Sequence, residues 1–210
     1  MSESTPNGER QPRTGKSLKA QQRRHEILRI AMDTFATRGY NNASLQEIAD
    51  RAGVTQAGVL HYFRSKTLLL ASVLQLRDDT DTDQDKERPR GLAFLQHLVD
   101  TMRRNAEREG IVRLYAVLSA ESTTEGHPAQ DYFRDRYESL RADVTAALAE
   151  AHELGEVRAD ANLEEAANAI IAVMDGLQIQ WLLAPDSVDM SAATDRVITA
   201  LLADITAKHT

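Results

Sequence analysis

The sequence predicts an all-α fold in which a small basic domain precedes a larger, acidic helical domain. Apolar residues recur at three- and four-residue spacing over most of the chain, as on one face of a helix. No segment alternates with period two for long enough to suggest a sheet. Residues 1–66 hold 11 Lys or Arg against 6 Asp or Glu, whereas residues 67–210 hold 14 against 26. This division favours two domains.

The chain begins with a polar arm, residues 1–18, which we expect to be disordered in isolation because it contains little to bury. A first helix is predicted from Lys19 to Arg38, with apolar residues on one stripe. Gly39 follows and can adopt the left-handed conformation that ends a helix.

Two short helices are predicted next. Ser44 and Glu47 have the spacing of a capping box, so the second helix starts at Ser44 and ends near Ala52, where Gly53 supplies a turn. Thr55 is the expected N-cap of the third helix. Helices this short must pack on the first helix to be stable. The predicted small domain is therefore a three-helix unit spanning residues 19–66.

The larger domain, residues 67–210, is predicted to be entirely helical. Ser65 caps a fourth helix that runs through Leu76, and the acidic stretch Asp78–Asp85 is interpreted as an exposed loop. Glycines and Pro185 then separate five further helical segments. These segments are Leu92–Arg108, Ile111–Ser122, Pro128–Leu154, Leu163–Leu183 and Ser191–Ala207.

Two short helices joined by a glycine turn fit a helix-turn-helix that reads DNA, although an ordinary helical corner has the same pattern. The third helix, about 12 Å long, matches a major groove about 12 Å wide. Gln56 could pair with an adenine edge and Thr55 with a base or phosphate. Ala57 and Gly58 would allow close approach of the backbone, and the remaining outward side chains of this helix are His61 and Tyr62. Ser44 and Lys66 stand at helix starts, which favour phosphate.

The segment from Thr37 to Lys66 resembles the N-terminal signature of TetR-family transcriptional regulators at nearly every position. The resemblance implies that the third helix enters the major groove and that His61, Tyr62 and Lys66 contact phosphates. It also places Ser44, Thr55 and Gln56 where family members commonly touch phosphate or bases. Two positions depart from the pattern. Leu60 stands where many members have a tyrosine, and Ala57 with Gly58 stands where glycine is usually followed by another small residue, so the bases that are read are left open.

The resemblance implies a homodimer and a small-molecule effector. In the family the last two long helices form a four-helix bundle across a two-fold axis, which here gives Leu163–Leu183 and Ser191–Ala207 and predicts a palindromic operator. The segment Asp175–Pro185 resembles the penultimate helix of one TetR subgroup. Helices between about 92 and 184 should enclose a cavity, although each candidate could equally be ordinary core. The candidates are Met102, Tyr115, Phe133, Asp175, Gln178 and Trp181.

Other classes of protein find little support. The chain has no cysteine, no glycine-rich phosphate loop and no Gly-x-Ser-x-Gly or His-Glu-x-x-His motif, so we expect neither an enzyme nor a cofactor. The six histidines lack ligand spacing, and Asp79, Asp81 and Asp83 are interpreted as a solvated loop and not a metal site. The first residues lack the features of a signal peptide, and no run approaches the roughly 18 apolar residues of a membrane span. A cytoplasmic protein is expected.

The sequence thus predicts a DNA-binding transcriptional regulator, a repressor released from a palindromic operator by a small molecule. The alternative is a helical dimeric scaffold or ligand-binding protein that no longer reads DNA. The basic arm has two interpretations, a solubility extension or a segment that orders on the minor groove or phosphates.

Overall fold

The computed structural model describes residues 15–81 and 89–206, and these residues confirm the all-α prediction. Apart from the helices, the described part contains an isolated β-bridge between Val157 and Thr206. Nine helices occur within the described ranges. They are α1 (Gly15–Asn42), α2 (Leu45–Arg51), α3 (Gln56–Phe63), α4 (Lys66–Asp81), α5 (Leu92–Asn105), α6 (Glu109–Glu121), α7 (Gln130–Glu153), α8 (Leu163–Leu183) and α9 (Met190–Ile205).

The predicted N-caps are present at the starts of α2, α3 and α4. The Ser44 hydroxyl accepts the backbone N–H of Glu47 at 3.0 Å, and the Thr55 hydroxyl accepts that of Gly58 at 3.1 Å. Ser65 caps α4 in the same way at 3.1 Å. Glu47 does not return the bond of a capping box within the described hydrogen bonds, and its carboxylate instead lies 3.5 Å from Arg38 Nε.

The end of the first helix is marked by a kink at Gly39. This residue has φ 72° and ψ 173°, a conformation that side chains other than glycine rarely adopt. One more turn, residues 40–42, follows before α2. The prediction that glycine breaks the helix after Arg38 is confirmed, and the helix begins four residues earlier than predicted.

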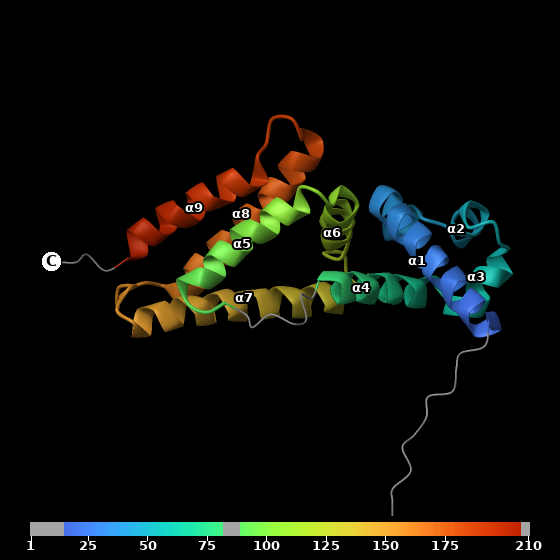
Figure 1. Cartoon of the computed structure of the whole chain (residues 1–210), viewed down its shortest axis with the longest axis horizontal. Coiled ribbons are helices and arrows are strands. Elements are labelled where there is room, and N and C mark those ends of the chain that lie inside the picture. The colour runs from blue at the N-terminus through green and yellow to red at the C-terminus, as the bar shows by residue number, and fades with distance from the viewer. Residues whose placement is uncertain (1–14, 82–88, 207–210) are drawn as a thin grey trace, which may run out of the picture.

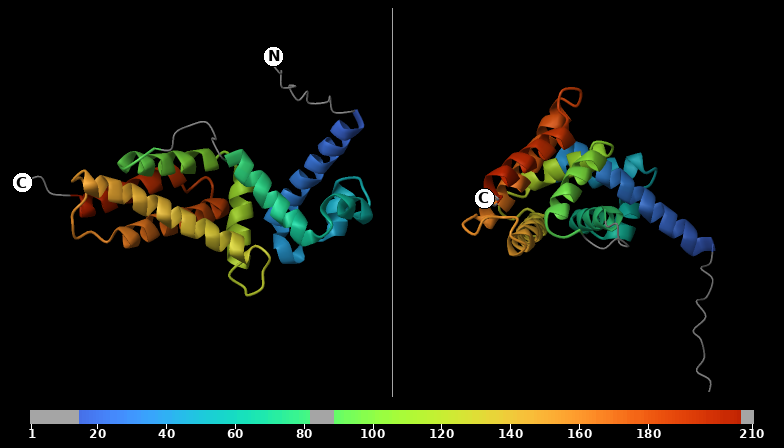
Figure 2. Two further views of the ribbon diagram at one scale, coloured as in Figure 1. Left: turned by 90° about the horizontal axis from the view of Figure 1, so that it is seen from below. Right: turned by 60° about the vertical axis from the view of Figure 1, so that its left-hand side comes forward.

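The molecule is elongated, with α1, α2 and α3 at one end and the bundle of α5, α7, α8 and α9 at the other (Figure 1). Helix α6 lies between these two groups and packs against α1, while α4 runs from the first group towards the second (Figure 2). The hydrophobic core at the α1 end includes Leu114, Leu118 and Phe133 from α6 and α7. Helices α6 and α7 therefore contribute side chains to the core at the α1 end, which joins the two ends of the molecule.

The outer face of α8 is apolar and largely uncovered. Ile179 is 50% exposed and Leu183 is 82% exposed. An 18-residue window of this helix has a mean hydropathy of 1.3, and 22% of it is buried. By length and composition alone the helix could cross a membrane, so the sequence-based statement that no run is long and apolar enough was wrong. A surface of this kind needs a covering partner.

The predicted loop at Asp78–Asp85 is wrong in its first half, because α4 continues to Asp81. Asp78 is a helical residue whose carboxylate accepts hydrogen bonds from the hydroxyls of Tyr115 and Tyr132 at 3.1 and 2.9 Å. These bonds stabilise an acidic residue inside the helix. The rest of that stretch, the side chains of the Asp79, Asp81 and Asp83 motif, and residues 1–14 of the arm lie outside the described residues.

Candidate DNA interface and ligand cavity

Helix α3 presents a small, polar outer face at the far end of the molecule. Thr55, Gln56, Ala57 and His61 are exposed. Gly58 and Tyr62 are half-buried, so the face predicted from the sequence is present with these two at its margin. With no bulky side chain in the first turn, backbone and Gln56 could approach a groove closely.

The inner face of α3 fixes the orientation of that surface. Val59 and Phe63 are buried in the core formed with α1. The guanidinium carbon of Arg24 lies 4.9 Å from the centroid of the Phe63 ring, so a cation also covers the end of the helix on the α1 side. The helix is thereby held with its outer face directed away from the protein.

Lys66 and Ser44 lie at the starts of α4 and α2, as predicted. Lys66 Nζ stands 4.4 Å from the centroid of the Tyr40 ring and donates to the Asn41 carbonyl at 3.5 Å. Partial burial lowers the pKa of Lys66, and the nearby Glu121 carboxylate partly opposes this shift. These contacts place the ammonium group beside Tyr40 at the start of α4.

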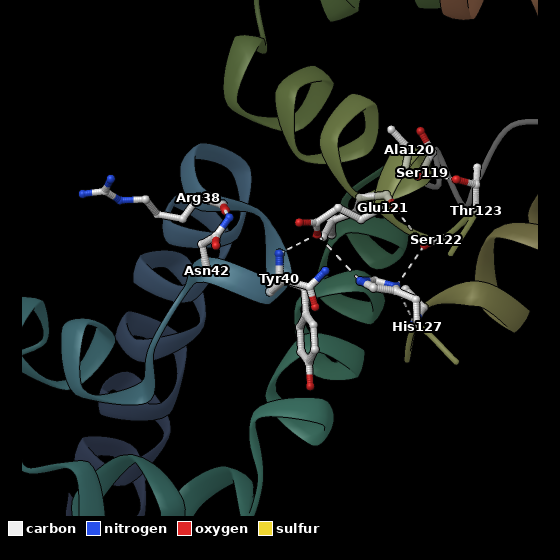
Figure 3. A network of polar contacts seen from close by, with 12 residues as sticks. Arg38, Tyr40, Asn42, Ser119, Ala120, Glu121, Ser122, Thr123 and His127 are labelled. Carbon is white, nitrogen blue, oxygen red and sulfur yellow. Dashed lines mark hydrogen bonds and ion pairs between the residues drawn. The ribbon is translucent and has the colours of Figure 1, made fainter. Parts of the chain in front are cut away.

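Glu121, the last residue of α6, joins the larger domain to the kink in α1 (Figure 3). Its Oε2 accepts the backbone N–H of Tyr40 at 2.6 Å. A Cβ built on Gly39 would lie 2.2 Å from Glu121 Oε1, so the carboxylate occupies the space that glycine leaves free. The same carboxylate acts electrostatically on Lys66. One side chain of α6 therefore bonds to the backbone at the kink and influences the charge of Lys66, a candidate phosphate contact.

His127 lies against Glu121 on the other side, without a hydrogen bond between the two. Its Nδ1 accepts the Ala129 N–H at 3.2 Å, which places the proton of a neutral ring on Nε2, and Nε2 lies 3.7 Å from Glu121 Oε2. The imidazole also meets the Tyr40 ring edge-on, with 5.3 Å between centroids. This network, which we call the Glu121 link, is largely buried and connects α6 to α1 through defined contacts.

Removing the Glu121 carboxylate should loosen the kink. In Glu121→Ala we expect the Tyr40 amide proton to exchange with solvent roughly ten- to hundredfold faster, because a hydrogen bond to a charged acceptor contributes about 1.5–3 kcal/mol. Hydrogen exchange measured by NMR checks this, with Glu125→Ala, an exposed carboxylate in the next loop, as the control. Unchanged exchange at Tyr40 would show that the link carries no stability.

A cavity of about 120 Å³ lies between α4, α5, α6, α7 and α8. It is smaller than the roughly 300 Å³ or more of sites for drug-sized ligands, so a compact molecule would fit best. Its wall is built of apolar and polar residues in equal number. The apolar side includes Leu98, Val112, Leu140, Val144, Ile171 and Met174, and the polar side includes Arg77, Thr101, Asn105, Tyr115, Ser119, Arg136, Tyr137, Asp175 and Gln178.

The six predicted ligand residues fall into two groups. Tyr115, Asp175 and Gln178 line the cavity. The other three do not: Met102 and Trp181 pack together in a small buried cluster, and Phe133 belongs to the core at the α1 end. Met102 nevertheless supports the wall, since its sulfur lies 3.7 Å from Gln178 Nε2.

The two arginines that give the cavity its positive charge were not predicted from the sequence. Arg77 and Arg136 place their guanidinium carbons 4.1 and 4.6 Å from the centroid of the Tyr115 ring. The Tyr137 hydroxyl donates to Asp175 Oδ2 at 2.7 Å. Burial raises the pKa of Tyr137 to about 12, assisted by Asp175, and burial also raises the pKa of Asp175. Only helical register on α4 and α7 could have pointed to these side chains.

Comparisons with known proteins cover both parts of the chain. Residues 27–73 match the family model described as bacterial regulatory proteins, tetR family. Residues 88–207 match the model for the C-terminal region of BetI-type transcriptional repressors. Among curated proteins, the chain is 28% identical over 187 residues to the HTH-type transcriptional regulator TtgR of Pseudomonas putida, covering 81% of this chain and 85% of TtgR. It is 26% identical over 198 residues to the repressor BepR of Brucella suis, covering 90% and 94%.

Solved structures share the fold. A transcriptional regulator from Saccharomonospora viridis, determined in complex with choline, aligns with a TM-score of 0.71 and 22% identity over 90% of this chain and all of that one. The SmeT–triclosan complex aligns with a TM-score of 0.68 and 19% identity over 90% and 93% of the two chains. Both alignments extend over the two ends of the molecule.

Proposed function

This chain belongs to the TetR family of bacterial transcriptional regulators, and from that premise we propose that it represses transcription as a homodimer on a palindromic operator. The observation that supports this most is the exposed outer face of α3, held by Val59 and Phe63 with a capped N-terminus. In this proposal the chain has three parts: an arm (1–18), a DNA-binding domain (19–66) and an effector-binding and dimerisation domain (67–210).

We propose that α8 and α9 pair with those of a second copy. The outer face of α8 carries exposed small or apolar residues at Ala169, Ala172, Ile179 and Leu183, which would allow close helix packing. Pairing with a second copy, and not contact with a membrane, is the proposed way of covering this face. A dimer presents two α3 helices to successive grooves, which is why the operator should be palindromic. The protein would act in the cytoplasm.

We propose that α3 reads bases through Gln56 and that Ser44, Thr55, His61 and Lys66 bind phosphates or neighbouring groups. Ala57 and Gly58 would permit close approach, and Tyr62 would contact phosphate at the edge. In support of this, Ser44 and Thr55 use their hydroxyl oxygens as acceptors in caps, so each hydroxyl keeps its own donor, and Lys66 makes only a long hydrogen bond of 3.5 Å. Base-edge and phosphate contacts have different signatures in binding experiments.

Substitutions in α3 and α4 test the proposal. Against the preferred duplex, Gln56→Ala should weaken binding by about 1–3 kcal/mol and relax the preference at one base pair per half-site. Lys66→Ala should weaken binding to all sequences and flatten the dependence of log K on log salt by about one unit per half-site. Fluorescence anisotropy over a salt series measures both.

Gln96→Ala and Arg134→Ala, exposed positions on α5 and α7, serve as matched controls and should bind DNA like the parent. Equal binding by all five proteins would reject α3 as the reading helix. Absence of sequence-specific binding by the parent would move a helical scaffold that has lost DNA binding ahead of the regulator.

We propose that ligand binding reaches DNA through α6. This helix lines the cavity with Val112, Tyr115 and Ser119 and ends in the Glu121 link. A shift of α6 would change the hold of Glu121 on both Tyr40 and Lys66. An effector changes operator affinity only if it binds the DNA-binding arrangement of the protein and the shifted arrangement with different affinity. In this proposal the cavity binds its ligand without transforming it. A bound effector that left operator affinity unchanged would contradict the mechanism.

A further inference from the structure

The cavity wall carries three charged side chains, and they are not equally engaged. Arg77 has Nη1 3.4 Å from Asp78 Oδ1 and lies over Tyr115. Asp175 accepts the Tyr137 hydroxyl. Two cations and one carboxyl thus surround the space, and the carboxyl already has a neutral donor.

Arg136 is the side chain with unused binding capacity. Its guanidinium stacks on Tyr115, 4.6 Å from the ring centroid. In the described part of the chain it makes neither a hydrogen bond nor an ion pair, although it lines the cavity and is half-buried. A guanidinium has five donors in a planar fork that matches a carboxylate. Stacking on Tyr115 restricts the fork and leaves its edge available.

We infer that the ligand of this cavity is a small organic acid whose carboxylate binds Arg136 and whose apolar body packs on the opposite wall. This deepens the proposed function and rests on it, because it names the chemical class of the effector. The small volume favours a single ring or a short branched chain. Leu98, Val144 and Ile171, from three different helices, form the apolar wall that such a body would contact.

The charge of the wall disfavours a cationic ligand. A quaternary ammonium is bound by aromatic faces that are free to receive it. Here the Tyr115 ring is already approached by the guanidinium groups of Arg77 and Arg136, which would repel a further cation. The Asp175 carboxyl, the acidic group of the wall, already accepts the Tyr137 hydroxyl at 2.7 Å. The chain should therefore differ in ligand charge from its structural relative in complex with choline.

Three probes of different charge test the inference: phenylacetate, its neutral analogue of the same size and shape, phenylacetamide, and the smaller cation choline. Isothermal titration calorimetry uses the full chain and its Arg136→Gln, Arg136→Lys and Arg134→Gln variants. We expect phenylacetate to bind at least about tenfold more tightly than phenylacetamide or choline. Arg136→Gln should weaken the binding of phenylacetate roughly ten- to hundredfold and leave the affinity for phenylacetamide unchanged, because the substitution removes only the charged guanidinium. The affinity of Arg136→Lys for phenylacetate should lie between that of the parent and that of Arg136→Gln.

Arg134 is an exposed arginine that pairs with Asp131 and lies two positions before Arg136 on α7, so Arg134→Gln should bind all three probes like the parent. The inference is overturned if choline or phenylacetamide binds as tightly as phenylacetate, if Arg136→Gln binds phenylacetate normally, or if phenylacetate does not bind at millimolar concentration. The same preparations are titrated with operator DNA. Operator binding without acid binding would refute the effector class alone, whereas absence of operator binding would refute the proposed function.

Discussion

Replacing Ala172 with arginine is expected to convert the protein to a monomer and to lower operator affinity by about a hundredfold or more. Ala172 is exposed in the middle of α8, between the small or apolar positions Ala169 and Gly176. Across a two-fold axis the new guanidinium would be buried twice against apolar helix surface, which costs several kcal/mol per charge. A monomer presents one α3 helix and loses the gain from binding two half-sites together.

Sedimentation velocity and anisotropy on the same samples measure the two effects. Ala142→Arg introduces the same side chain at an exposed position of α7, outside the predicted dimer surface, and should remain dimeric. A dimeric Ala172→Arg protein with normal DNA binding would show that α8 does not form the interface, and another partner would have to cover its apolar face.

Replacing Gly39 with alanine is expected to destabilise the fold by about 2–4 kcal/mol, which corresponds to a drop of roughly 5–15 °C in Tm for a chain of this size. Two causes add. The backbone at Gly39 has φ 72°, where a Cβ is strained, and that Cβ would lie 2.2 Å from Glu121 Oε1. The carboxylate would have to move, and the Tyr40 N–H would lose its acceptor.

Differential scanning calorimetry measures the change, and Gly110→Ala is the matched control. Gly110 lies in the first turn of α6, and a Cβ there meets nothing within 4 Å. This control should be as stable as the parent or slightly more stable, because alanine restricts the unfolded chain. If Gly39→Ala were equally stable, the kink and the Glu121 link would not hold the two ends of the molecule together.

Local features of the fold could be predicted from the sequence because they depend on neighbouring residues. The N-caps at Ser44, Thr55 and Ser65 each join atoms three residues apart. Gly39 breaks its helix through its own backbone freedom. The loop from Asp78 was predicted wrongly because the prediction used only the acidic composition of neighbouring residues. The tyrosines that bind Asp78 lie 37 and 54 residues away along the chain.

The cavity could be predicted only in part, because its wall is assembled from distant segments. Asp175 was recognisable as a carboxyl inside an apolar run, but its partner Tyr137 lies 38 residues earlier on another helix. The Glu121 link joins residues 81 apart, and no periodicity reveals it. Phe133 and Trp181 have the same helical spacing as a lining residue would have, and only tertiary packing places them in cores.

Selection of duplexes from a random DNA pool by the 210-residue chain tests whether this protein reads an operator as a dimer. We expect enrichment of a palindromic sequence whose half-sites are centred about one helical turn apart or a multiple of it, with binding greatly weakened in Ala172→Arg and the base preference relaxed in Gln56→Ala. Failure to enrich any sequence at moderate salt, or a selected site unaffected by both substitutions, would contradict this expectation.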